Sequence, residues 1–311
     1  MIQANALTKR YGTKTAVDGV SFEVRAGRVT GFLGPNGAGK STTMRMIVGL
    51  DRPTSGSVTV NGKPYAKHAA PLREVGALLD AKAAHPGRSA YHHLLSLART
   101  HGIPKSRVRE VIDIVGLKDV ADKRAGAFSL GMGQRLGIAV ALLGDPATLI
   151  LDEPVNGLDP DGVLWVRRLL QRLASEGRTV FVSSHLMSEM SLVATHLIVI
   201  GRGRIIADAA IDDFLDQAAG THVIVRSPAA PRLAEILRAG GATVAMAENA
   251  ALRVTGTAIE AIGEAAAANG IVLHELSEHR ASLEDAFMQA TGDVLDYRGT
   301  SAAPGATGSV R

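Results

Sequence analysis

The chain has 311 residues, of which 46% are hydrophobic and 21% charged, a composition that excludes global disorder and predicts one large domain with a smaller one. Lysines and arginines number 34 against 30 aspartates and glutamates, an excess too small and too dispersed to indicate nucleic-acid binding. Because cysteine is absent, a disulfide framework and a thiolate metal site are excluded, and a cytoplasmic setting fits.

The first part of the chain alternates short strands and turns around one helix. Strands are expected at 20–24, 28–33 and 57–60, and the helix at 39–48. The pair Asn61-Gly62 is typical of a hairpin turn. From Ser89 to about Val120 apolar residues recur at helical spacing, which predicts a helical subdomain at about 85–145 inserted between strands.

The next part alternates strands with helices. Strands are expected at 148–151, 179–182 and 197–200, and helices at 161–175 and 187–194. Such alternation predicts a mainly parallel sheet covered on both faces, and hence an α/β domain at 1–218.

Near Ala218 the pattern restarts as β-α-β-β-α-β, which predicts a small α+β, ferredoxin-like domain at 219–292. Its strands are expected at 222–226, 243–246, 252–255 and 271–276, and its helices at 232–238 and 258–268. Thr257 and Glu260 have capping-box spacing, and Gly270 closes the second helix. The tail, 293–311, is small and polar, so we expect it to be disordered.

The segment GPNGAGKST has the spacing of a phosphate-binding loop and stands between a predicted strand and a predicted helix. Glycine backbones can turn successive N–H groups toward phosphate oxygens, while the lysine adds a mobile charge and the serine hydroxyl can ligate Mg²⁺. The residues are Gly34, Pro35, Asn36, Gly37, Ala38, Gly39, Lys40, Ser41 and Thr42. The alternative is a glycine-rich turn with an incidental lysine. We favour binding of ATP.

The apolar run ATLILDEP ends in two carboxylates, Asp152 and Glu153. Beside the loop strand, such a strand would bring Asp152 near Mg²⁺ and let Glu153 polarise the attacking water as a general base. The alternative is a pair of solubilising acids at a strand end, followed by a proline that stops the ladder.

A third element, FSLGMGQR, resembles the signature motif of ABC transporter nucleotide-binding subunits, with Ser129, Gly131, Gln134 and Arg135 matching and the two intervening residues Leu130 and Met132 departing. The resemblance implies a mixed sheet with antiparallel β and helical subdomains. It also implies that Ser129 and Gly131 cap the γ-phosphate bound by the opposite subunit of a homodimer. The alternative is a plain N-cap of a helix at 134–143.

Further positions resemble family elements, each with a simpler alternative. Asp159 resembles the D-loop aspartate; His185 resembles the switch histidine that contacts the γ-phosphate, or is a satisfied polar residue. Tyr11 resembles the aromatic that stacks on adenine, or is a half-packed turn tyrosine. Asp80 stands where the family usually has a glutamine and is either a further Mg²⁺ ligand or a surface acid, which puts coupling to the membrane partner in doubt.

The resemblance covers residues 1–216, and the segment ASLEDAFMQATG resembles the end of single-cassette, drug- and antibiotic-export ATPases of the ABC-2 type. It implies an ATPase that drives a separate integral-membrane permease from the cytoplasmic face. The N-terminal residues lack the apolar core of a signal peptide and no apolar run approaches ~20 residues, so we expect neither a leader nor a membrane span. Alternatives are a soluble ABC-type ATPase acting on ribosomes or DNA, and a binding-only protein. We expect the small domain to stabilise the dimer or regulate it.

Overall fold

The computed structural model describes residues 1–311 except 81–82, 220–221, 248–250, 280–281 and 292–311. Its largest sheet has six strands in the order β5-β6-β7-β3-β8-β9, in which every neighbouring pair is parallel except the edge pair β8–β9. The strands are β3 (Val29–Leu33), β5 (Val75–Leu78), β6 (Thr148–Asp152), β7 (Thr179–Ser183), β8 (His196–Gly201) and β9 (Arg204–Ala210). The expected mainly parallel sheet is confirmed.

A second, antiparallel sheet packs against the first. Its strands are β1 (Ile2–Tyr11), β2 (Lys14–Val24) and β4 (Ser55–Val60), in the order β2-β1-β4. Phe22 of β2 lies 6.0 Å and 5.9 Å, between ring centroids, from Phe32 of β3 and Phe181 of β7. Helix α1 (Lys40–Ile47) adds apolar side chains to this same core, so the helix that follows the glycine-rich loop is clamped by both sheets.

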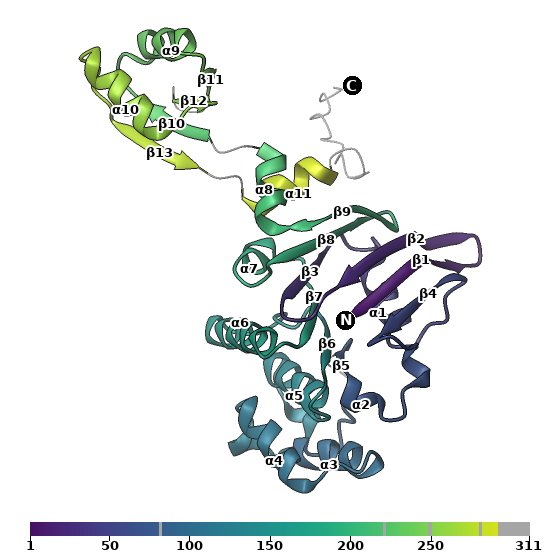
Figure 1. Cartoon of the computed structure of the whole chain (residues 1–311). Coiled ribbons are helices and arrows are strands. Elements are labelled where there is room, and N and C mark those ends of the chain that lie inside the picture. The colour runs from purple at the N-terminus through teal and green to yellow at the C-terminus, as the bar shows by residue number, and fades with distance from the viewer. Residues whose placement is uncertain (81–82, 220–221, 248–250, 280–281, 292–311) are drawn as a thin grey trace, which may run out of the picture.

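Helices cover the six-stranded sheet and extend into a helical subdomain (Figure 1). The block expected from Ser89 to Val120 is divided into two helices, because Gly102 adopts a positive φ of 64° and Pro104 starts the second helix. The helix expected at 134–143 begins at Leu130, four residues before its expected start. The helices are α3 (Ala90–Thr100), α4 (Lys105–Ile114), α5 (Leu130–Leu142) and α6 (Pro160–Ser175).

Short elements complete the larger domain. They are α2 (Pro71–Glu74), α7 (Met187–Ser191) and the 3-10 turns η1 (Tyr65–Lys67), η2 (Lys118–Val120) and η3 (Ala125–Ala127). The turn expected at Asn61-Gly62 is present, with positive φ at both residues and mutual backbone bonds between Val60 and Lys63. Helix α7 ends three residues before the expected boundary.

The small domain has the expected β-α-β-β-α-β order and its own apolar core. Its antiparallel strands lie in the order β11-β12-β10-β13, which is the ferredoxin-like arrangement. The elements are β10 (His222–Arg226), α9 (Ala230–Ala239), β11 (Thr243–Met246), β12 (Leu252–Thr255), α10 (Ile259–Ala268) and β13 (Glu275–His279). The capping box expected at Thr257 and Glu260 is wrong, since Ala258 is the N-cap of α10 and no side chain bonds there.

The chain leaves the larger domain through α8 (Ile211–Ala219) and returns through α11 (Leu283–Thr291), and these two helices pack side by side (Figure 1). Leu283, Ala286 and Phe287 are buried in the core of the larger domain. The sequence-based boundary grouped this segment with the small domain at 219–292, whereas α11 packs in the core of the larger domain. The tail at 293–311 lies outside the described residues. No helix in the described ranges has the length and apolarity that crossing a bilayer requires.

Candidate nucleotide-binding site

The glycine-rich loop joins β3 to α1, and its backbone shape explains its glycines. A Cβ atom on Gly34 would collide with the carbonyl oxygen of Ile200, and one on Gly39 would lie 2.7 Å from the carbonyl oxygen of Ala16. Gly39 also has a φ of 112°, which L side chains rarely adopt. The loop therefore curls against neighbouring backbone at the start of α1. The first N–H groups of a helix have no partner within it, an arrangement that favours anions.

Lys40 is the first residue of α1 and is only 7% exposed. Its Nζ donates hydrogen bonds to the carbonyl oxygens of Gly34, at 2.5 Å, and Pro35, at 3.3 Å. Burial lowers the pKa of Lys40, although the carboxylates of Glu153 and Asp152 act to raise it. A desolvated cation held over the loop is suited to binding a phosphate oxygen.

The Ser41 hydroxyl donates to Oδ2 of Asp152 at 2.7 Å, which joins α1 to the end of β6. Asp152 pairs with Ser183 in the parallel register of β6 and β7, and the Ser183 hydroxyl donates to its other carboxylate oxygen. Both carboxylate oxygens are thus oriented by hydroxyl groups. The expected approach of Asp152 to the loop serine is present, but the expectation that its strand lies beside the loop strand is wrong, because β7 lies between β6 and β3.

Glu153 follows β6 with a φ of 51°, a left-handed conformation uncommon for a residue with a side chain. Its backbone is held on both sides: the N–H donates to Ser183 Oγ at 3.0 Å, and the carbonyl accepts from Gln134 Nε2 at 2.7 Å. This turn sends the Glu153 carboxylate toward His185, whose Nδ1 lies 2.7 Å from Oε2 and whose backbone N–H lies 3.3 Å from it.

An open cleft of about 360 Å³ lies over the loop. It is lined by Tyr11, Lys14, Ala16, Pro35, Asn36, Gly37, Gly39, Lys40, Ser41, Thr42, Asp152 and Glu153. The structure therefore brings most of the loop, both strand-end acids and Tyr11 into one cavity. The other two loop residues do not line the cleft: Gly34 lies against the backbone of Ile200, and Ala38 is buried.

Tyr11 ends β1 at the rim of the cleft and is 48% exposed. Its hydroxyl donates to Asp51 Oδ2 at 2.9 Å, and Lys9 Nζ lies 5.0 Å from the ring centroid. Desolvation, and then the bond to Asp51, raise the pKa of the Tyr11 phenol. The hydroxyl is therefore anchored while the ring faces the cleft.

The remaining expected residues lie outside this cleft. Ser129 and Asp159 are the N-caps of α5 and α6, accepting bonds from the backbone N–H groups of Met132, at 3.2 Å, and Gly162, at 2.9 Å. A Cβ atom on Gly131 would lie 3.1 Å from the carbonyl oxygen of Gly157, so the signature segment packs on the loop before α6. Asp80 follows β5, the strand beside β6, but does not line the cleft.

Sequence reasoning missed two residues that hold Glu153. Ser183 ends β7, and the signal that could have found it is its position directly after the strand expected at 179–182, the next strand along the chain after β6. Gln134 was recognised only as a match to the signature motif, whereas its side chain is buried and bonded to the Glu153 backbone. Lys14 and Ala16 of β2 were missed as lining residues because no local pattern indicates that β2 passes the loop.

A glycine-rich loop between β3 and α1, with acids at the end of β6, which is parallel to β3 and separated from it by β7, defines a P-loop ATPase. Residues 17–156 match the ABC transporter family, residues 124–191 match an AAA domain family described as a putative AbiEii toxin of a type IV toxin–antitoxin system, and residues 221–284 match a domain family of unknown function, DUF8746.

Two relatives place the chain more closely. The bacitracin transport ATP-binding protein BcrA of Bacillus licheniformis is 43% identical over 215 residues, which cover 68% of this chain and 70% of that protein. The ABC transporter ATP-binding protein YhcH of Bacillus subtilis is 35% identical over 300 residues, covering 95% and 97%. The chain therefore belongs to the ATP-binding proteins of ABC transporters. It is the ATP-binding and ATP-hydrolysing subunit of such a transporter.

Solved structures agree on the fold. An ATP-binding subunit of an ABC transporter superposes with a TM-score of 0.64 at 25% identity, covering 70% of this chain and 92% of that one. A cassette solved as a dimer in a post-hydrolysis state with ADP and phosphate has a TM-score of 0.62 at 23% identity, covering 68% and 99%. The expected α/β cassette fold is confirmed. These matches give no support to the alternative of an ATPase that acts on ribosomes or DNA.

Proposed function

We propose that two copies of the chain bind two Mg·ATP molecules between them and drive a separate membrane permease that exports an antibiotic, drug or lipid-like compound. The observation that carries the proposal is the cluster of Ser41, Asp152, Glu153 and His185 at one edge of the sheet, beside the glycine-rich loop. Support for the cargo class comes from the names of similar proteins, which describe transport of bacitracin and lantibiotics and resistance to linearmycin.

The residues present fit Mg²⁺. Ser41 Oγ and Asp152 Oδ2 lie 2.7 Å apart, and hydroxyl and carboxylate oxygens are the donors that this ion prefers. No group of three or more acidic, histidine or cysteine side chains capable of holding a metal occurs in the described part of the chain, which suits an ion shared with substrate phosphates. When bound, Mg²⁺ would neutralise charge on the β- and γ-phosphates. Asp80 is proposed only as a further, outer ligand of this ion.

Hydrolysis needs a general base, and it needs positive charge or hydrogen-bond donors around the γ-phosphate. The Glu153 carboxylate is fixed by the backbone bonds of its own turn, so it can accept a proton from a water molecule in line with the phosphate. Lys40 holds the phosphate oxygens from the loop side. His185 shares a hydrogen bond with Glu153 and would orient both the carboxylate and the γ-phosphate.

Dimerisation would complete the site, because Ser129 and Gly131 lie outside the cleft of their own subunit. The first turn of α5 presents backbone N–H groups, and Leu130 beside it is 50% exposed. A helix N-terminus of this kind suits the γ-phosphate of ATP bound to the partner subunit. We assign Asp159, at the N-cap of α6, to the same interface.

We assign residues 1–218 together with α11 to the ATPase domain and β10 to β13 to a regulatory or dimer-stabilising domain. Support comes from the separate apolar core of the small domain and from the return of α11 to the larger core. Because the chain enters and leaves the small domain through the packed helices α8 and α11, a movement of that domain would displace these two helices. We place the subunit at the cytoplasmic membrane face, held there by the permease.

The proposal is tested by expressing the chain together with any integral-membrane protein that a neighbouring gene encodes, in a strain that is sensitive to bacitracin, lantibiotics and linearmycin. Export predicts a raised inhibitory concentration for at least one compound, lost when Glu153 is changed to Gln. Co-purification of the two proteins from membranes is the second measurement. Recovery of the chain with ribosomes and not with the membrane protein would contradict the proposal.

A further inference from the structure

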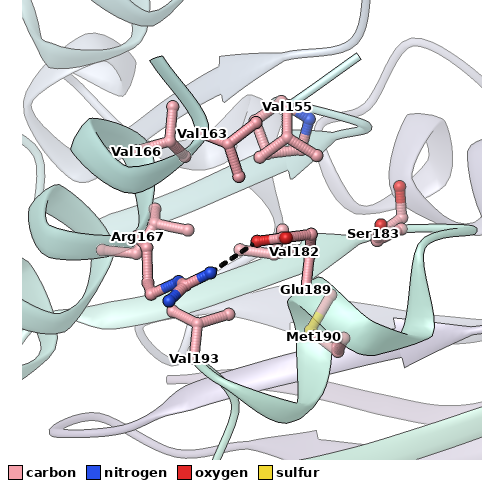
Figure 2. Close-up of a pocket in the computed structure, with 12 residues that line it drawn as sticks. Val155, Val163, Val166, Arg167, Val182, Ser183, Glu189, Met190 and Val193 are labelled. Carbon is pink, nitrogen blue, oxygen red and sulfur yellow. Dashed lines mark hydrogen bonds and ion pairs between the residues drawn. The ribbon is translucent and has the colours of Figure 1, made fainter. Parts of the chain in front are cut away.

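A small apolar cavity lies directly behind the site, between α6, α7 and the ends of β6 and β7. Valine is the commonest residue in its walls, and Val155, two residues after Glu153, is one of them (Figure 2). Ser184, immediately before His185, also lines it. The cavity measures about 20 Å³, room for about one water molecule, so it cannot hold an organic ligand. Its walls connect the two segments that carry the proposed base and the switch histidine.

One ion pair closes this cavity. Arg167 of α6 and Glu189 of α7 point toward one another across it, with Nη2 and Oε2 2.8 Å apart (Figure 2). Their side chains are 24% and 30% exposed, so the pair is partly withdrawn from water. The Nε atom of Arg167 is buried and has no hydrogen-bond partner within the described residues. Removing either charge would leave its partner against a largely apolar wall.

Helix α7 depends on such contacts for its position. It has five residues, and its N-cap, Leu186, makes no side-chain bond, so its own hydrogen bonds cannot hold it in place. Met190 anchors one face by packing where a side chain on Gly31 would otherwise sit. Helix α6 provides two polar attachments: the ion pair at Arg167 and, one turn on, Gln171 Nε2 donating to the carbonyl oxygen of Leu192 at 3.1 Å.

Each of the two helices begins at, or two residues after, a proposed site residue. Helix α6 starts at its N-cap Asp159, and α7 starts two residues after His185. We propose that the Arg167–Glu189 ion pair positions His185 against Glu153, by fastening the helix that follows the histidine to the helix that carries Asp159. Both are positioning residues, and this inference rests on the proposed hydrolytic role of Glu153.

The test compares the full-length variants E189Q, R167K and R168Q for ATP hydrolysis and nucleotide binding. E189Q should lower kcat about tenfold, less than the roughly hundredfold expected for a misplacement of a full ångström, while the KM for ATP stays within about twofold. R167K keeps the charge and should retain most of kcat. Arg168 lies on the exposed side of the same helix, so R168Q should match the wild type.

The double variant R167E/E189R, in which the two charges are exchanged, distinguishes loss of the ion pair from a general loss of stability. If the ion pair acts by holding α7, this variant should recover at least about a third of the kcat lost in E189Q, because an opposite-charge pair is restored. An unchanged kcat in E189Q, or a loss in E189Q that R168Q reproduces, would overturn the inference. If E153Q also hydrolyses ATP normally, the proposed function fails; if E153Q is inactive and E189Q is normal, only the positioning role fails.

Discussion

His185 Nδ1 lies 2.7 Å from Oε2 of Glu153, although the two residues are 32 positions apart in the chain. The contact forms because β6 and β7 are parallel neighbours whose ends reach the same edge of the sheet. The left-handed backbone at Glu153 then turns its side chain toward the loop after β7. The Glu153 carboxylate and the His185 imidazole are thereby held together beside the cleft over the loop.

The first prediction concerns Glu153→Gln. The amide keeps the size of the side chain but cannot accept a proton from water, so turnover should fall by about a thousandfold or more while ATP still binds. Steady-state phosphate release and binding of a fluorescent ATP analogue measure the two effects, and gel filtration with ATP should show a trapped dimer. Normal turnover would refute the role of Glu153 as base.

Lys40→Met removes the charge over the loop and keeps an apolar stem in its buried position. Because the ammonium group supplies charge-assisted hydrogen bonds to phosphate, ATP affinity should fall by about tenfold to a hundredfold. Equilibrium binding with and without Mg²⁺ is the measurement. Lys14, which lines the rim, provides a control, since K14M should change affinity far less.

The same variant gives a pH prediction for the nucleotide-free protein. Burial lowers the pKa of Lys40 below its unfolded value of 10.5, so the unfolded state binds the proton more tightly. The free energy of unfolding should therefore rise with pH between the folded pKa and 10.5, relative to the K40M variant, which lacks this group. Urea unfolding of both proteins from pH 7.5 to about 10 checks the sign. If the unfolding free energy of the wild type minus that of K40M stays constant or falls as the pH rises, the burial of a charged lysine is contradicted.

Tyr11→Ala removes the ring at the rim of the cleft. If this ring stacks on adenine, the KM for ATP should rise about fivefold to tenfold with little change in kcat, as expected for loss of roughly 1 kcal/mol of stacking. Tyr11→Phe is the matched control, because it keeps the ring and loses only the bond to Asp51. Equal effects of the two substitutions would show that the anchoring hydroxyl, and not the ring, matters.

A last prediction tests the small domain. Excising residues 220–281 and joining α8 to α11 with a short glycine-serine linker keeps Leu283, Ala286 and Phe287 in the larger core. This protein should fold and hydrolyse ATP but lose part of its dimerisation or its regulation by the permease. Ending the chain at 219 is the comparison, and it should be less stable because the core loses α11. Unchanged dimerisation and regulation after excision would remove the proposed role.

Many features were predictable because each depends on a short run of neighbouring residues. The glycines, the lysine and the serine of the loop are consecutive or nearly so between Gly34 and Thr42. The two acids at the end of β6, Asp152 and Glu153, are adjacent in the sequence. Strands β10, β11 and β12 were predicted with the bounds that the structure has, since short runs of alternating apolar residues were bounded by turns. The strands β1, β5 and β9 were missed, as was the true start of β13.

Other features depend on contacts between distant segments, which no local pattern encodes. The pairing of β6 with β7 decides that Ser183 holds Asp152, and only the packing of α5 on the strand end decides that Gln134 holds the Glu153 backbone. The return of α11 and the Arg167–Glu189 contact likewise join parts of the chain far apart in sequence. The sequence by itself determined which chemical groups are present and where each phosphate-binding element begins. Their distances were decided by tertiary structure, because strand register and helix packing minimise the free energy of the whole core and not of any single segment.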